Sequence, residues 1–153
     1  MSKITERAAA PDFQLESGGG PIRLGDFAGK TLVVYFYPKD DTTGCTREAI
    51  GFSENARKFR DVPVIGVSKD SIASHDRFKA KYKLKIALAS DPEVQTAKDY
   101  AVWGEKTLYG RKYMGMERAT FLVDAKGVIH SVWRKVKVAG HVEAVLAAVK
   151  TLS

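Results

Sequence analysis

The stretch TLVVYFYPKDDTTGCTREA, residues 31–49, joins a strongly apolar run to the only cysteine of the chain, Cys45. Residues 31–38 are mostly apolar and β-branched, which indicates a strand buried on both faces and ended by Pro38. Apolar residues then recur at helical spacing over 43–60, so Cys45 falls in the first turn of a predicted helix. The single thiol therefore lies at the start of a predicted helix, after a buried strand and a short loop.

The same reading extends along the chain as strands that alternate with helices. Strands are predicted at 62–68 and 86–92, helices at 71–84, 93–102 and 139–152, and a hairpin at 118–134 around the turn DAKG. Ser71 is the predicted N-cap of its helix. FQLES and PIRL are N-terminal additions, and residues 103–117 are predicted to be a long connection, either functional or a plain insertion. This order indicates an α/β, thioredoxin-like fold: a central mixed sheet flanked by helices, with an N-terminal β addition.

Length and composition suit a compact protein. The 153 residues predict one domain over 1–153, and a 44% share of hydrophobic residues is enough for a core. No apolar run approaches the roughly 20 residues that cross a bilayer, and the start MSKITERAAAPDF lacks the apolar centre of a secretion signal. One cysteine cannot make an internal disulfide, which fits a reducing compartment and predicts a cytoplasmic location.

The charge pattern excludes little by itself. The net charge is +7, and the basic clusters RKFR, KAKYKLK and RKVK all lie beyond residue 56. Such clusters can bind nucleic acid but are more often solvated faces, and no nucleic-acid motif accompanies them. His75, His130 and His141 show no metal-ligand spacing, so we predict neither a metal nor a cofactor. The adjacent Asp40 and Asp41 are predicted to be solvated.

The surroundings of Cys45 favour a reactive thiolate over an inert thiol. The thiolate is the nucleophile, and the unpaired N–H groups and dipole of a helix start favour negative charge. Thr42 lies three residues earlier, so its hydroxyl is expected to fold back toward the sulfur or a substrate. Arg118, which opens a predicted strand, is the candidate cation. The alternative is that Cys45 is a small buried hydrophobic residue, the common role of a free cysteine.

Four further residues are candidates for the substrate pocket. Gly44 directly precedes Cys45 at the helix start. Glu48 lies three residues after Cys45 on the same helix face, where it is expected to pair with an arginine or to form a simple surface pair. Tyr37 and Trp103 are predicted either to line the pocket or to serve as ordinary core residues.

The residues around Cys45 resemble a known family. PKDDTTGC has the form P-x-x-x-T-x-x-C, the active-site motif of peroxiredoxins, with Pro38, Thr42 and Cys45 in the matching places. Several segments are similar to the bacterioferritin comigratory protein, or peroxiredoxin Q, subfamily: VVYFYP, GCTREA, SKDS, LASDP, VWGEK, YGRKYMGMERATFLVD and KVKVAGHVEAVL. The resemblance covers nearly the whole chain.

This resemblance implies a set of roles. Cys45 would be the peroxidatic cysteine, which attacks a peroxide oxygen and becomes a sulfenic acid. Arg118 would be the second active-site cation and stabilise the charge on the departing oxygen. Thr42 would hydrogen-bond the peroxide and the sulfur, and Pro38 would shield the thiolate from water. Hydrogen peroxide and organic hydroperoxides are the implied substrates, and antioxidant defence is the implied purpose.

The sequence departs from the subfamily where a resolving cysteine often stands. Those places are Ile50 and about Lys79 here, so an external thiol must resolve the sulfenic acid, or the chain is a natural or engineered one-cysteine form. Thioredoxin, glutaredoxin or a small thiol is the expected reductant, and a monomer or weak dimer the expected state. A thioredoxin-type disulfide reductase is rejected because Glu48 stands where its second cysteine is needed. A catalytically silent redox sensor or binding module remains the alternative, and it predicts an exposed Cys45.

Overall fold

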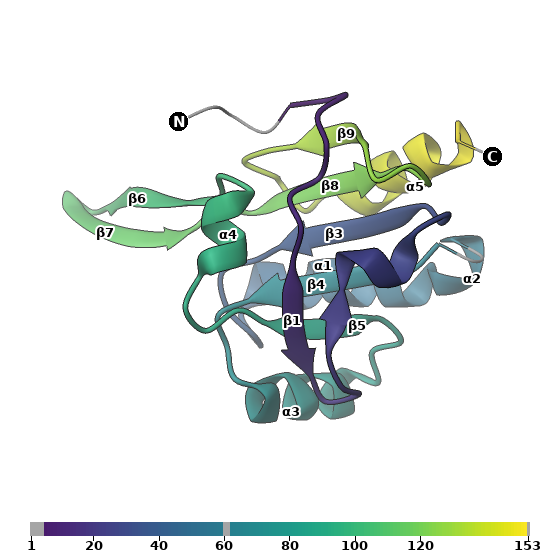
Figure 1. The fold of residues 1–153 in the computed structure, drawn as a ribbon. Helices are drawn as coiled ribbons and strands as arrows, with labels where there is room; N and C mark the ends of the chain where they lie inside the picture. Colours follow the sequence, from purple (N-terminus) through teal and green to yellow (C-terminus); the bar gives the residue numbers. More distant parts are fainter. Residues whose placement is uncertain (1–4, 60–61, 153) are drawn as a thin grey trace.

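A mixed sheet forms the centre of the fold (Figure 1). The computed structural model describes residues 5–59 and 62–152, and within them seven strands follow the order β2-β1-β5-β4-β3-β8-β9. The strands are β1 (Gln14–Ser17), β2 (Ile22–Arg23), β3 (Leu32–Phe36), β4 (Val64–Ser68), β5 (Ala87–Ser90), β8 (Ala119–Val123) and β9 (Ile129–Trp133). β3, β4 and β5 are parallel, whereas β8, β9, β1 and β2 pair antiparallel with their neighbours. This arrangement confirms the predicted thioredoxin-like sheet.

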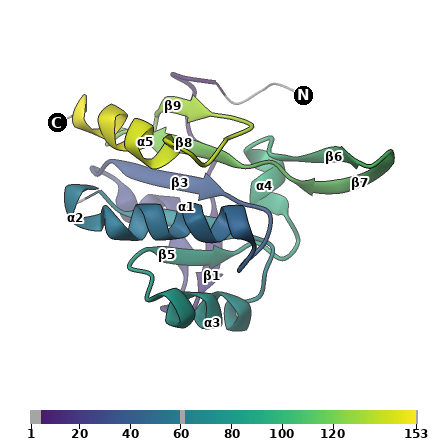
Figure 2. The ribbon, with the colours of Figure 1, turned by 180° about the vertical axis from the view of Figure 1, so that it is seen from behind.

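Both faces of the sheet are covered, which explains why β3 is apolar throughout. Alternate side chains of β3 point to opposite faces, so Val34 enters one apolar cluster and Tyr35 enters the other. Helices α1 (Thr43–Glu54) and α5 (His141–Lys150) lie over one face (Figure 2). The 3-10 turn η1 (Leu24–Phe27), strand β1 and helix α4 (Gln95–Asp99) cover the other face (Figure 1). The continuous apolar run is therefore the central strand of the core.

The predicted helices are present, but the one over 43–60 is divided and the other three are shorter than predicted. The helix expected over 43–60 ends at Glu54, and a separate short helix, α2 (Ala56–Phe59), follows Asn55; Arg60 lies outside the described residues. Helix α3 (Ile72–Tyr82) begins after Ser71, whose hydroxyl accepts a hydrogen bond from the Ser74 backbone N–H at 3.1 Å. The predicted cap is thus confirmed.

The long connection predicted at 103–117 is wrong. This segment is a β-hairpin of β6 (Trp103–Leu108) and β7 (Arg111–Met116), joined by Tyr109 and Gly110, and it extends away from the main sheet (Figure 1). Both turn residues have positive φ, 51° and 77°, as a two-residue hairpin turn with this twist requires. Tyrosine is uncommon in that conformation, so the turn signal was weak. The hairpin ends two residues before Arg118 and so leads the chain back to the site.

No helix in the described parts of the chain is long and apolar enough to cross a bilayer.

Candidate active site

Cys45 lies in the first turn of α1, at the end of the loop that follows β3. Thr42 is the N-cap, with an extended backbone, and α1 begins at Thr43. The Cys45 side chain is packed with residues of β3, α1 and α5, and only 1% of Cys45 is exposed. The exposed thiol that a silent sensor module would need is therefore not found. The predicted position at a helix start is confirmed.

Arg118 brings a positive charge to the sulfur. It directly precedes β8, and its Nη2 donates a hydrogen bond to Cys45 Sγ over 3.3 Å. Gly44 leaves room for this contact, because a Cβ at that position would come within 3.1 Å of the same Nη2. A guanidinium and the first turn of a helix thus both lie at the sulfur. The structure thus joins two residues that are 73 positions apart in sequence.

Glu48 occupies the other side of the guanidinium. Its Oε1 accepts from Arg118 Nη1 over 2.8 Å, and the side chain is fully buried, so the surface-pair alternative is wrong. Burial raises the pKa of Glu48 to about 7, although the charge and hydrogen bond of Arg118 oppose this shift. Its Oε2 has no hydrogen-bond partner among the described residues. Glu48 therefore holds Arg118 in place, although burial disfavours the charged form of its carboxyl group.

His141 stands behind this ion pair, and sequence reasoning missed its place. It is 5% exposed, and its Nε2 lies 2.7 Å from Thr120 Oγ1. The same nitrogen is 3.9 Å from Glu48 Oε2. Burial lowers the pKa of His141 to about 4, and the nearby charge of Arg118 adds to this effect. A buried, neutral imidazole thus backs the Glu48 carboxylate.

Thr42 and Pro38 belong to the loop in front of Cys45. The Thr42 hydroxyl donates to the Lys39 carbonyl oxygen over 2.9 Å, and Thr42 itself is exposed. No hydrogen bond joins it to the sulfur among the described residues, so the expected fold-back is not made in this state. Its oxygen keeps lone pairs for another donor. Pro38 is half-buried at the end of the strand.

The comparison with known proteins shows the family of the chain. The model of the AhpC/TSA family matches residues 7–132. The chain belongs to this family. A putative peroxiredoxin bcp of Coxiella burnetii is 47% identical over 90% of this chain and 93% of its own length. Peroxiredoxin Bcp of Bacillus subtilis is 44% identical, with 94% of each chain covered.

Solved structures agree with the sequence relatives. A serine variant of Xanthomonas campestris peroxiredoxin Q superposes with a TM-score of 0.87 at 43% identity, covering 92% of each chain. Another structure concerns the alkyl peroxide reduction activity of the X. campestris bacterioferritin comigratory protein, with a TM-score of 0.86, 43% identity, and 91% and 90% of the two chains covered. The protein is thus a peroxiredoxin of the Bcp, or peroxiredoxin Q, type, and it has one cysteine.

Two candidate pocket residues of this peroxiredoxin have other principal contacts. Tyr37 shares the apolar cluster of Cys45, but its hydroxyl donates to Asp40 Oδ1 at 2.5 Å. Trp103 packs against the cluster on the other face of the sheet, where the Lys69 ammonium lies 5.9 Å from its ring centroid. The structure therefore brings Gly44 and Glu48 to Cys45 and assigns Trp103 to the opposite face.

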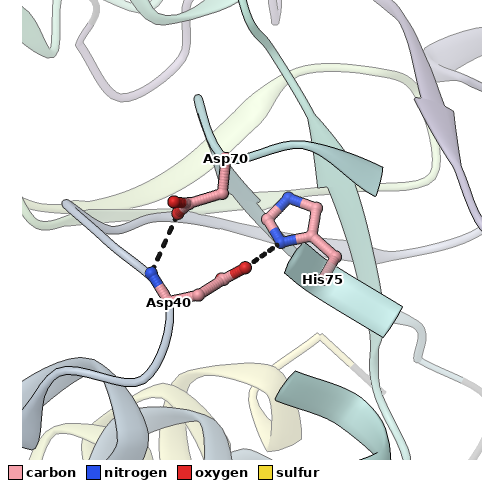
Figure 3. Close-up of side chains that lie close together, drawn as sticks. All are labelled: Asp40, Asp70 and His75. Carbon is pink, nitrogen blue, oxygen red and sulfur yellow. Dashed lines mark hydrogen bonds and ion pairs between the residues drawn. The ribbon is translucent and has the colours of Figure 1, made fainter. Parts of the chain in front are cut away.

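The prediction that both aspartates are solvated is wrong for Asp40. Asp40 is 8% exposed, and its Oδ2 lies 2.7 Å from His75 Nδ1 (Figure 3). Its backbone N–H donates to Asp70 Oδ2 over 2.9 Å, and Ser74 Oγ donates to its Oδ2 over 2.8 Å. Asp41 is exposed and accepts from Lys81 and Tyr82 instead. Adjacent carboxylates thus have opposite environments, because the loop turns through a positive φ of 59° at Asp41.

The Asp40 cluster has the residue types of a metal site. Ligand atoms of Asp40, Asp70 and His75 lie within 4.8 Å of one another. Hydrogen bonds within the protein already engage Asp40 Oδ2, Asp70 Oδ2 and His75 Nδ1. The cluster is therefore accounted for by protein hydrogen bonds. Sequence reasoning missed it because its members come from three separate segments.

Proposed function

We propose that this peroxiredoxin reduces hydrogen peroxide and alkyl hydroperoxides through Cys45. The observation that carries the proposal is the contact of Arg118 Nη2 with the Cys45 sulfur at the start of α1. The thiolate forms a bond to one peroxide oxygen while the O–O bond breaks, giving Cys45 sulfenic acid and an alkoxide or hydroxide that takes up a proton. Arg118 and the N–H groups of the first turn stabilise the charge on the departing oxygen.

We assign supporting roles to three further residues. Thr42 offers its hydroxyl oxygen to the peroxide proton, Pro38 limits the access of water, and Glu48 holds the guanidinium of Arg118 in place. The 2.8 Å contact between Glu48 and Arg118 supports the last assignment. The alkyl peroxide reduction described for the X. campestris relative supports the substrate class.

The second half of the cycle needs a thiol from outside the chain. A first thiol condenses with the sulfenic acid to give a mixed disulfide and water, and a second thiol releases Cys45 as a thiol and leaves with the disulfide. Thioredoxin, glutaredoxin or a small thiol fits this requirement. The proposed setting is the cytoplasm, because the one-cysteine chemistry depends on a reducing pool. The proposal also includes that the protein is a single domain and that it is a monomer or weak dimer.

The test follows the mass of Cys45 after stoichiometric peroxide. We expect the parent protein to gain one oxygen rapidly and to form a mixed disulfide when a small thiol is added. Cys45→Ser should consume no peroxide and keep its circular dichroism spectrum, because the change is small. A parent thiol that oxidises no faster than free cysteine would support a silent module instead.

A further inference from the structure

His75 is placed so that each of its ring nitrogens contacts an oxygen. The residue is 1% exposed; Nδ1 lies 2.7 Å from Asp40 Oδ2, and Nε2 lies 3.0 Å from the Ala89 carbonyl oxygen. A carbonyl oxygen only accepts. Burial alone would raise the pKa of Asp40, but hydrogen bonds from His75, Tyr37 and Ser74 lower it overall, so Asp40 is a carboxylate and also only accepts. His75 therefore bridges two acceptors, one on the loop before Cys45 and one on β5.

The other polar groups around the ring form hydrogen bonds with Asp40. The Tyr37 hydroxyl is 3.4 Å from Nδ1, but its proton goes to Asp40 Oδ1. Ser74, on α3, gives its proton to Asp40 Oδ2, and Asp70, after β4, accepts from the Asp40 backbone. Asp40 is thus the shared partner of the His75 ring, the Tyr37 and Ser74 hydroxyls and the Asp70 carboxylate.

This pair connects the loop before Cys45 to the rest of the fold. Asp40 is the middle of the segment between β3 and α1, which carries Pro38 at one end and Thr42 at the other. His75 belongs to α3 and reaches the central sheet through the Ala89 carbonyl on β5. The loop is therefore fixed to both a helix and a strand through one buried ring. A further attachment of the loop, from Asp41 to Lys81 and Tyr82, is exposed to water.

We propose that His75 is a positioning residue for the peroxide reaction: bridging Asp40 and Ala89, it sets the loop that presents Pro38 and Thr42 to the Cys45 sulfur. This inference rests on the proposed peroxidase function. His75 does not touch the sulfur, so its effect is on geometry. Small displacements of positioning groups are costly, since a misplacement of about 1 Å can slow a reaction by roughly 10²-fold.

Two substitutions separate the two bonds of the ring. In His75→Asn the amide nitrogen takes the place of Nδ1 and keeps the bond to Asp40, whereas in His75→Gln it takes the place of Nε2 and keeps the bond to Ala89. We expect His75→Gln to lower the second-order rate constant for Cys45 oxidation by about tenfold or more, and His75→Asn to lower it much less. The readout is rapid-quench mass spectrometry with hydrogen peroxide, beside the thermal midpoint of each variant.

A control tests whether any weakening of α3 has the same effect. Ser71→Ala removes the N-cap bond of α3 but leaves the His75 and Asp40 contacts in place. It should lower the thermal midpoint without slowing Cys45 oxidation. If His75→Asn and His75→Gln slow the reaction equally, or if the rate follows the thermal midpoint across all three variants, the role is merely structural and the proposal is overturned.

The experiment remains decisive if the His75 variants do not fold. Asp40→Asn keeps the size of the side chain and weakens its hydrogen bond to His75, and it should slow Cys45 oxidation in a folded protein. A folded Asp40→Asn protein that reacts at the parent rate would overturn the proposal. The failure of the proposed function would look different, because the parent Cys45 itself would then not be oxidised.

Discussion

Arg118 and Glu48 form a buried ion pair in which Nη1 of the arginine lies 2.8 Å from Oε1 of the glutamate. The other terminal nitrogen of the same guanidinium reaches the Cys45 sulfur. The planar guanidinium of Arg118 thus contacts both the Glu48 carboxyl group that holds it and the sulfur of Cys45. This geometry suits arginine and not lysine, whose charge is a single point.

Arg118→Lys should slow Cys45 oxidation by roughly 10²-fold, because an ammonium cannot contact Glu48 and the sulfur in the same way. Stopped-flow measurement with hydrogen peroxide tests this expectation. Arg47→Lys is the matched control, since Arg47 lies exposed on α1, the helix that carries Cys45. Equal rates for the parent and Arg118→Lys would show that the double contact of the guanidinium does not contribute to the rate of Cys45 oxidation.

Glu48 and His141 should make opposite contributions to stability as the pH changes. The pKa of Glu48 is raised from 4.5 to about 7, so its contribution is full below pH 4.5 and is lost as the pH rises through 7. The pKa of His141 is lowered from 6.5 to about 4, so its contribution is present above pH 6.5 and is lost as the pH falls through 4. Each effect is about 3 kcal/mol by the linkage relation, and the two largely cancel in the parent.

Glu48→Gln should expose the contribution of His141. The unfolding free energy of the parent, relative to that of Glu48→Gln, is expected to grow as the pH falls from 7 to 4.5, because only the parent gains a proton at residue 48 on folding. Urea unfolding at a series of pH values gives the two curves. Parallel curves would mean that Glu48 titrates normally in the folded protein.

Tyr35→Phe should stabilise the fold. The Tyr35 hydroxyl is buried and has no hydrogen-bond partner among the described residues, so removing it is expected to raise the unfolding free energy by about 1 kcal/mol. Tyr100→Phe is the matched control, because the Tyr100 hydroxyl donates to the Pro11 carbonyl oxygen over 2.7 Å. That change should lower the unfolding free energy by about 1 kcal/mol. Urea denaturation measures both changes. If the unfolding free energy changes in the same direction in both variants, the prediction is wrong.

Without a partner thiol in the chain, Cys45 should be overoxidised by excess peroxide. When no reductant is present, mass spectrometry is expected to find two or three added oxygens on Cys45, together with loss of activity. Ile50→Cys should reduce this overoxidation, although α1 must open locally, since residues five apart on an intact helix are too distant to bond. Ile50→Ser is its control. A parent that stays at the sulfenic stage would contradict this prediction.

The sequence predicted the parts of the site that are encoded locally. The apolar run of β3 and the helical spacing after it placed Cys45 at a helix start, and the motif matched Pro38 and Thr42 to their positions. Arg118 was found through its place before a predicted strand and through the family resemblance. Each of these signals lies within a short segment whose residue pattern has one strong structural meaning.

The sequence did not predict contacts made by distant residues. Asp40 and His75 lie 35 positions apart, and neither periodicity nor charge distinguishes the buried Asp40 from the exposed Asp41. The burial of His141 depends on its contacts with Phe52 of α1, Thr120 of β8 and Trp133 of β9, which the helix pattern alone does not specify. The β6–β7 hairpin was missed because Tyr109 adopts a backbone conformation that usually signals glycine or asparagine. These features are products of tertiary packing.

The near-complete enclosure of the Cys45 side chain gives the two half-reactions different size limits. A peroxide group is small enough to enter beside Arg118, whereas a protein thiol must bring its own backbone to the same sulfur. A protein reductant therefore requires the first turn of α1 to open, a requirement that a small thiol does not share. The frequency of that opening then limits turnover with a protein reductant.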